Sequence, residues 1–189
     1  MPVEPDRDRL LTMMRELALT RESVRLSSGR RSTHYFDARQ VLLDPEGATL
    51  AGRIGFETIR PSAPGAVGGL TLGADPLVSA ISLAAWTAGE RWNGFLVRKD
   101  AKPHGLQQWL EGPFIEEGAP VAVVDDVLTS GGSLRTAIER TRQAGGVVVA
   151  ALVVVDREED DGRARVEEVL GGAPLHAIFT ASEILGDGG

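Results

Sequence analysis

Residues 121–133 read VAVVDDVLTSGGS. The first four residues are apolar and rich in valine, which is typical of a buried strand. Two acids follow, Asp125 and Asp126, and a short run of small and hydroxylated residues (TSGGS, 129–133) then leads into a helical pattern over 133–144. A buried strand, a glycine-rich turn and a helix in succession predict one unit of an α/β fold.

The rest of the chain repeats this alternation. We predict further strands at 66–70, 94–97, 147–156 and 175–180, and helices at 6–19, 45–59, 76–89 and 182–185, the last capped by Ser182. Residues 24–37 are predicted to form two short strands around a glycine-centred turn. Because near-continuous apolar strands alternate with amphipathic helices, the sheet should be mostly parallel and covered on both faces. Ligands bind at the carboxyl ends of the strands in such sheets.

Composition narrows the class of protein. The chain has 189 residues, a formal net charge of −7 and no cysteine, which fits one domain without disulfides or thiol catalysis. The acidic balance argues against a nucleic-acid or membrane-surface binder. The charged N-terminus is unlike a signal peptide, and no apolar run reaches the about 18 residues of a membrane span. We therefore expect a cytoplasmic protein.

The acid pair and the loop after it predict a sugar-phosphate site. Small residues let backbone N–H groups converge at the start of a helix, where the helix dipole favours an anion. Neither a Walker A loop nor a dinucleotide fingerprint is present. Two carboxylates beside a phosphate are reasonable if the ligand also carries hydroxyls, as ribose 5-phosphate does. The 2- and 3-hydroxyls would donate to Asp125 and Asp126 while residues 129–133 hold the phosphate.

A second motif, RKDAKPHG (98–105), contains both lysines of a chain that has eighteen arginines. Lysine is a compact, mobile charge that approaches phosphates closely. Proline and glycine favour a loop here, and a polar loop between strands could close over a ligand. Four side chains would offset the charge of a pyrophosphate: Arg98, Lys99, Lys102 and His104.

These motifs resemble those of a broad enzyme family and of one branch within it. Residues 121–133 are similar to the phosphoribosyl pyrophosphate (PRPP) motif of type I phosphoribosyltransferases. The lysine motif resembles the catalytic loop of the orotate phosphoribosyltransferases, SSGRRSTHYFDAR (27–39) their hood over the base, and GGLTLGADP (68–76) their pyrophosphate-side loop. The resemblance implies a single domain over 1–189, with the hood and an N-terminal helix at about 1–40 and a PRPP-binding core at about 60–160.

The resemblance also implies a reaction: orotate and PRPP would give orotidine 5-monophosphate and pyrophosphate, on the pathway to UMP. PRPP would be bound by the four basic side chains of the lysine motif and by Asp125, Asp126, Val127, Leu128, Thr129, Ser130, Gly131, Gly132 and Ser133. Orotate would be bound by Thr129, Arg157, Tyr35 and Phe36. Lys102 or His104 would protonate the leaving pyrophosphate, and the sequence does not choose between them. Mg²⁺ would be held mainly through PRPP, without direct protein ligands.

The family resemblance further implies a homodimer in which the lysine loop reaches the partner's site. Many members carry lysines where this chain has Ser27 and Gly73, so part of the pyrophosphate contact set differs. Two alternatives stay open. A base-salvage phosphoribosyltransferase would share 121–133 but would not need the lysine motif or Arg157. A PRPP-binding regulator without catalysis would be expected to show a basic nucleic-acid surface.

Overall fold

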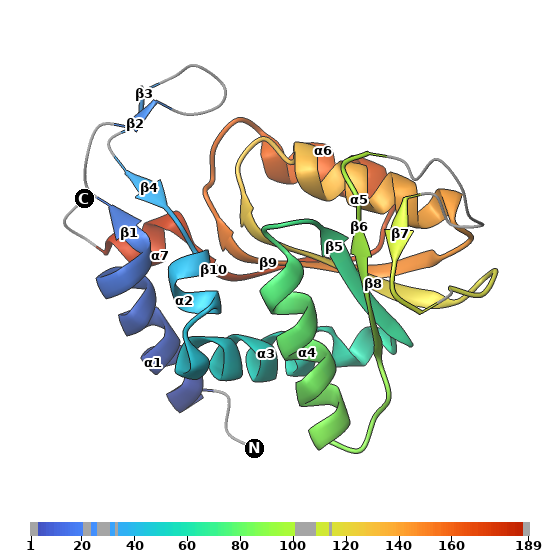
Figure 1. The fold of residues 1–189 in the computed structure, drawn as a ribbon. Helices are drawn as coiled ribbons and strands as arrows, with labels where there is room; N and C mark the ends of the chain where they lie inside the picture. The colour runs from blue at the N-terminus through green and yellow to red at the C-terminus, as the bar shows by residue number, and fades with distance from the viewer. Residues whose placement is uncertain are drawn as a thin grey trace.

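The computed structural model describes residues 4–20, 24–25, 31–32, 34–100, 109–113 and 115–186. Six strands in this part of the chain form the central sheet (Figure 1), in the order β10-β9-β8-β5-β6-β7. Their bounds are β5 (Ala66–Leu70), β6 (Asn93–Val97), β7 (Leu110–Glu111), β8 (Pro120–Leu128), β9 (Val147–Asp156) and β10 (Leu175–Thr180). Neighbours pair in parallel except β6 and β7, which are antiparallel. The predicted mostly parallel sheet is therefore confirmed, and β7 is an addition to it.

Helices cover both faces of the sheet (Figure 1). On one face lie α5 (Gly132–Gln143) and α6 (Gly162–Leu170). The other face is covered by α1 (Glu4–Met13) with its π-helical continuation η1 (Met14–Ala18), α2 (Arg39–Leu42), α3 (Pro45–Ile59), which ends in the 3₁₀ turn η2 (Arg60–Ser62), and α4 (Asp75–Thr87). The start of α3 follows from its sequence, because the Asp44 carboxylate accepts hydrogen bonds from the Glu46 and Gly47 amides and Pro45 occupies the first helical position.

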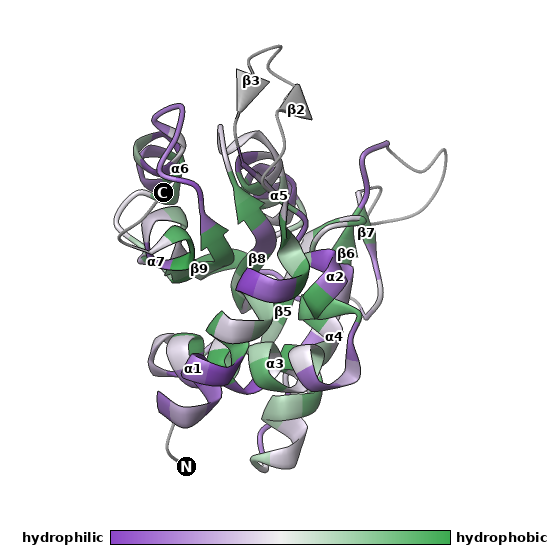
Figure 2. Ribbon diagram, turned by 90° about the vertical axis from the view of Figure 1, so that its left-hand side faces the viewer, coloured by the Kyte–Doolittle hydropathy of each residue, from purple (hydrophilic) through white to green (hydrophobic). Residues whose placement is uncertain are grey.

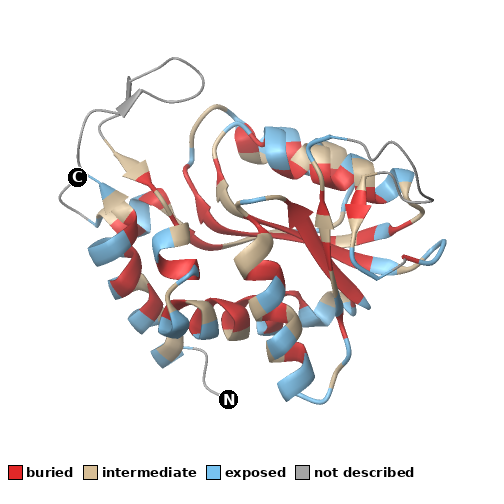
Figure 3. Cartoon of the chain, viewed as in Figure 1, coloured by how far each residue is buried: buried red, intermediate tan, exposed pale blue. Residues whose placement is uncertain are grey.

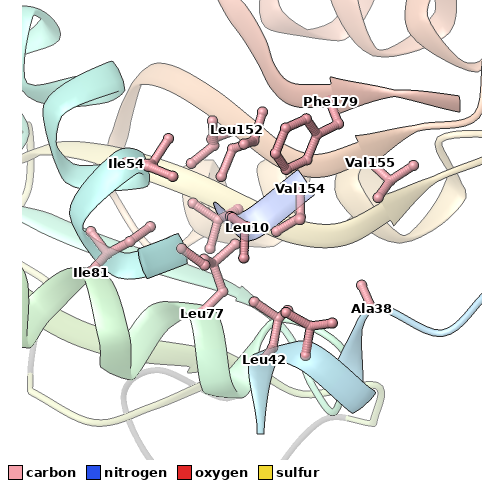
Figure 4. Packing of buried hydrophobic residues seen from close by; sticks show 14 of the residues in the cluster. Leu10, Ala38, Leu42, Ile54, Leu77, Ile81, Leu152, Val154, Val155 and Phe179 are labelled. Carbon is pink, nitrogen blue, oxygen red and sulfur yellow. The ribbon is translucent and has the colours of Figure 1, made fainter. Parts of the chain in front are cut away.

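The alternation of side chains along β8 divides the core into two layers. Val121 and Val123 pack in the cluster beneath α5 and α6, whereas Ala122 and Val124 pack in the cluster beneath α3 and α4. Both faces of the sheet are buried (Figure 3), and its strands are mainly apolar (Figure 2). Figure 4 shows the second cluster, in which Leu152 and Phe179 of the sheet pack with the helices below. This double burial explains the near-continuous apolar strands.

Two small antiparallel pairs precede the main sheet. β2 (Val24–Arg25) pairs with β3 (Arg31–Ser32), as the pattern over 24–37 predicts. β4 (Tyr35–Phe36) pairs instead with β1 (Leu19–Thr20), directly after η1. The N-terminal hood expected from the family resemblance is therefore present as antiparallel strands, and β1–β4 ties it to the first helix.

Two details of the C-terminal third differ from the sequence prediction. Ser182 is not a helix cap: α7 (Ala181–Leu185) begins after Thr180, whose hydroxyl accepts from the Glu183 amide in a reciprocal capping box. The Ser182 amide and hydroxyl donate instead to Glu158. Helix α6 is also absent from the prediction, because its charged surface gives a weak apolar period. Among the described residues we find no helix long and apolar enough to span a bilayer.

Candidate functional site

The acid pair lies at the carboxyl end of β8, within the strand. Adjacent strand residues face opposite sides, so Asp125 lies on the side of α5 and Asp126 on the side of α4. Asp125 is 5% exposed and Asp126 is half-buried. The Asp126 amide donates to Asp125 Oδ1 at 3.0 Å, and the Val127 amide donates to Asp126 Oδ1 at 2.8 Å. The strand end therefore presents the Asp126 carboxylate and covers that of Asp125.

Burial sets the protonation of Asp125. It raises the pKa of this carboxyl well above its usual range, and the nearby charge of Asp126 raises the pKa further. The fold therefore favours the protonated form of this buried carboxyl.

The loop after β8 is fixed by close packing against α6. Gly131 has φ 79°, and a Cβ there would lie 2.8 Å from Val166 Cγ2. A Cβ on Gly162 would lie 1.9 Å from the Thr129 carbonyl oxygen. Both contacts require glycine, and they hold the loop in one shape. Its outer residues are exposed at the start of the twelve-residue helix α5: Ser130, Gly132 and Ser133. This is the geometry of an anion site at a helix N-terminus.

Arg157 follows β9, the neighbour of β8, and its amide donates to the Leu128 carbonyl at 2.9 Å. Its side chain is 3% exposed. Nη2 donates to Glu159 Oε1 at 2.9 Å and to the His34 carbonyl at 3.2 Å, and the guanidinium lies 5.7 Å from the centre of the Phe36 ring. The structure therefore brings Arg157 and the hood strand β4 together. Phe36 is buried in the core, whereas Tyr35 is half-buried.

The loop between β5 and α4 lies close to the acid pair. A Cβ on Gly73 would lie 2.7 Å from Asp126 Oδ1, so glycine allows this loop to approach the carboxylate. Arg39, next to the hood, pairs with Asp37 at 2.8 Å. The hydrogen bond and charge of Asp37 raise the pKa of Arg39, and the charge of Asp126 adds to this. Arg39 therefore adds a cation to the surroundings of the acid pair.

The lysine motif is described only at its start. Arg98 Nη1 lies 2.8 Å from Glu111 Oε1 of β7, and Arg98 Nε donates to the Asp100 carbonyl at 3.0 Å. Lys99 is exposed. Lys102 and His104 lie outside the described residues, as does Ser27, so their predicted roles stay predictions.

Sequence reasoning missed one partner of the predicted base-side arginine. Glu159 belongs to the acidic run 158–161, which reads as a solvated patch in the sequence. The signal that identifies it is its position two residues after Arg157, within reach of that side chain once the strand ends.

Comparisons with known proteins agree with this geometry. No protein-family model matches the chain. The orotate phosphoribosyltransferase of Thermosynechococcus vestitus is 40% identical over 178 residues, covering 94% of this chain and 92% of the relative. The Streptomyces coelicolor enzyme of the same name is 42% identical over 173 residues, 92% of each chain.

A solved structure shows the same similarity. The orotate phosphoribosyltransferase of Mycobacterium tuberculosis H37Rv, in complex with PRPP, superposes with a TM-score of 0.77 at 34% identity, over 95% of this chain and 99% of that one. Such identity over nearly the whole chain establishes kinship as well as fold. The chain belongs to the orotate phosphoribosyltransferases, a family of pentosyltransferases with the type I phosphoribosyltransferase fold.

Proposed function

We propose that this protein transfers the phosphoribosyl group of PRPP to orotate, forming orotidine 5-monophosphate and pyrophosphate on the route to UMP. One observation carries the proposal: the acid pair, the anion loop and Arg157 meet at the carboxyl ends of the neighbouring strands β8 and β9. A ribose phosphate and an anionic base would thereby be held side by side. The Mycobacterium tuberculosis relative, solved with PRPP, supports the choice of sugar phosphate.

PRPP would be bound from its 5-phosphate inwards. Residues 129–133 offer backbone N–H groups and hydroxyls to the phosphate at the start of α5. The Asp126 carboxylate accepts from a ribose hydroxyl, and Asp125 supports it from the covered side of the strand. We assign Val127 and Leu128 to the strand end that sets the position of these groups.

The chemistry is a displacement at the anomeric carbon. A bond forms from that carbon to the base nitrogen, which gives up its N–H proton, while the bond from the carbon to the pyrophosphate oxygen breaks, with inversion. Positive charge develops on the ribose ring, and the adjacent Asp126 carboxylate stabilises it. The departing pyrophosphate gains negative charge. We propose that Arg98, Lys99, Lys102 and His104 neutralise it, with Lys102 or His104 as the proton donor.

On the base side, Arg157 would pair with the orotate carboxylate, since guanidinium and carboxylate form a bidentate, charge-assisted pair. Thr129, Tyr35 and Phe36 would border the base. The half-buried Tyr35 is the better placed of the two aromatic residues, because Phe36 is buried in the core.

Mg²⁺ is proposed as the cofactor. Within the part of the chain that the structure describes, no cluster of three or more acidic or histidine side chains could hold a metal by itself. PRPP would supply most of the oxygens that hold the ion, without direct protein ligands. When bound, the ion would neutralise charge on the pyrophosphate. We further propose that the protein is a homodimer with shared sites and that it is cytoplasmic. The chain would form a single domain that consists of the hood and the core.

The direct test is the absorbance of orotate mixed with the purified protein, PRPP and Mg²⁺. We expect the orotate signal to be lost only when both PRPP and Mg²⁺ are present. Uracil, adenine and hypoxanthine are assayed alongside. Turnover of one of these bases without turnover of orotate would move the protein to base salvage, and PRPP binding without any turnover would favour a regulator.

A further inference from the structure

The Nη2 nitrogen of Arg157 lies within hydrogen-bond distance of two acceptors of the chain itself. It donates to Glu159 Oε1 at 2.9 Å and to the His34 carbonyl at 3.2 Å. An Nη nitrogen carries two hydrogens, so both hydrogens of Nη2 are directed at atoms of the chain itself. A carboxylate that approaches this guanidinium therefore finds the hydrogens of Nη2 already hydrogen-bonded within the chain.

The shape of the guanidinium determines which of its hydrogens a ligand carboxylate needs for a bidentate pair. A carboxylate pairs bidentately either with Nε and Nη2 or with Nη1 and Nη2. Both arrangements need a hydrogen of Nη2. A ligand carboxylate can therefore form the strong pair with Arg157 only if Glu159 or the His34 carbonyl gives up its hydrogen bond.

Glu159 is the acceptor that can yield. Its side chain is 33% exposed, so water can solvate the carboxylate once it leaves Arg157. It also lies between residues with left-handed backbone, Glu158 and Asp160, both at φ 56°. Such a conformation is strained for residues other than glycine, which favours rearrangement of this turn. The His34 carbonyl, by contrast, is backbone that leads into the paired strand β4.

We propose that Glu159 is an internal counter-ion that occupies Arg157 in the empty site and is displaced by the carboxylate of the incoming base. This inference rests on the proposed function, because it takes orotate as that base. Two carboxylates on one guanidinium repel each other, so the substrate carboxylate takes the place of Glu159. Glu159 is therefore a specificity-determining residue that acts through Arg157.

The exchange explains how the site would reject uncharged bases. A substrate carboxylate replaces the charge-assisted hydrogen bond that Glu159 gives up, so its binding stays favourable. A base such as uracil has no carboxylate and leaves the Arg157–Glu159 pair closed. Selection thus includes an internal competitor as well as an attractive contact.

The test is Glu159→Gln. Glutamine keeps the size of the side chain and an acceptor oxygen but removes the charge, so it should compete less well for Arg157. We expect the KM for orotate at saturating PRPP to fall about threefold to tenfold, with the KM for PRPP unchanged. The inhibition constant of the uncharged carboxamide of orotate should not change. The matched control is Glu158→Gln, because Glu158 contacts Ser182 instead of Arg157.

The outcomes separate this inference from the proposed function. Wild-type protein that does not consume orotate with PRPP would contradict the proposed function, and the inference with it. Active wild-type protein whose Glu159→Gln variant has an equal or higher KM for orotate would contradict only the inference, since a higher KM means that Glu159 positions Arg157. An equal gain in affinity for the carboxamide would also contradict it.

Discussion

The phosphate loop and the arginine side of the site are neighbours, yet they are built by opposite means. The loop at 129–133 offers backbone groups, and its shape depends on the missing side chains of Gly131 and Gly162. The base side depends on one long side chain, Arg157, which is 3% exposed and balanced by Glu159. The first region is exposed and rigid by packing, and the second is buried and held by charge.

This difference predicts how each region fails. Adding a methyl group should damage the loop, because the space for a Cβ is filled by backbone and by Val166. Removing a charge should damage the arginine side, because a buried guanidinium and its partners depend on one another. The two failures should also separate kinetically, one on PRPP and the other on the base.

The largest effect is expected for Arg157→Ala. Loss of a buried, bidentate charge pair should weaken binding by about 3 kcal/mol, so the KM for orotate should rise about a hundredfold. The KM for PRPP should change little, because the loop at 129–133 is untouched. Steady-state kinetics with each substrate varied in turn measure both values, and Arg165→Ala, an exposed arginine on α6, is the control. Equal increases in both KM values would refute the division of the site.

The reciprocal experiment is Gly131→Ala. A Cβ at φ 79° is strained and meets Val166 Cγ2 at 2.8 Å, so the loop must move. We expect about 2 kcal/mol less stability, which lowers the Tm by about 5 °C, and PRPP binding about tenfold weaker.

The stability control for this variant is Gly132→Ala. A Cβ at Gly132 would have only Ser130 Oγ at 3.8 Å nearby, so its Tm should stay close to that of the wild type. Calorimetry with PRPP and thermal melting measure both effects. A Gly131→Ala variant with normal PRPP affinity would show that the loop is less constrained than its packing indicates.

The fold could be predicted from sequence because its strands are local signals. A strand buried on both faces reads as an apolar run, as 121–124 and 147–155 do. The two-residue strands β7 and β1 were not predicted, because each carries too little pattern of its own and is defined by its pairing, with β6 and with β4 respectively. The cap of α7 could have been predicted, however, because Thr180 and Glu183 have the spacing of a capping box. The prediction of Ser182 as the cap was wrong.

The residues of the site also differ in whether the sequence alone identifies them. The acid pair and the loop are contiguous in sequence, so one motif names them. Arg157 was identified only through the family resemblance, and its partners Glu159 and His34 require the folded chain. The burial of Asp125 also depends on the fold, because strand alternation alone does not show which face α5 covers. The roles assigned to these residues stay predictions until they are measured.

The smallest expected effect concerns Asp125, and it has a defined sign. Burial raises the pKa of Asp125 in the folded protein above the about 3.9 of an unfolded aspartate, and the charge of Asp126 adds to this. Between these two pKa values the folded state binds more protons than the unfolded state. The contribution of Asp125 to the free energy of unfolding therefore falls as pH rises from about 4 to the folded pKa.

Asp125→Asn should remove this pH dependence. Its amide oxygen can still accept from the Asp126 amide, so the strand end keeps its geometry. Without PRPP, the stability of the variant relative to wild type should increase with pH through this window and then level off. Urea denaturation from pH 4 to pH 8 measures the difference, with Asp8→Asn, an exposed acid on α1, as the control for loss of one charge. A difference that is constant, or that decreases with pH, would mean that Asp125 is ionised in the folded protein and that both acids, rather than Asp126 alone, carry charge at the strand end.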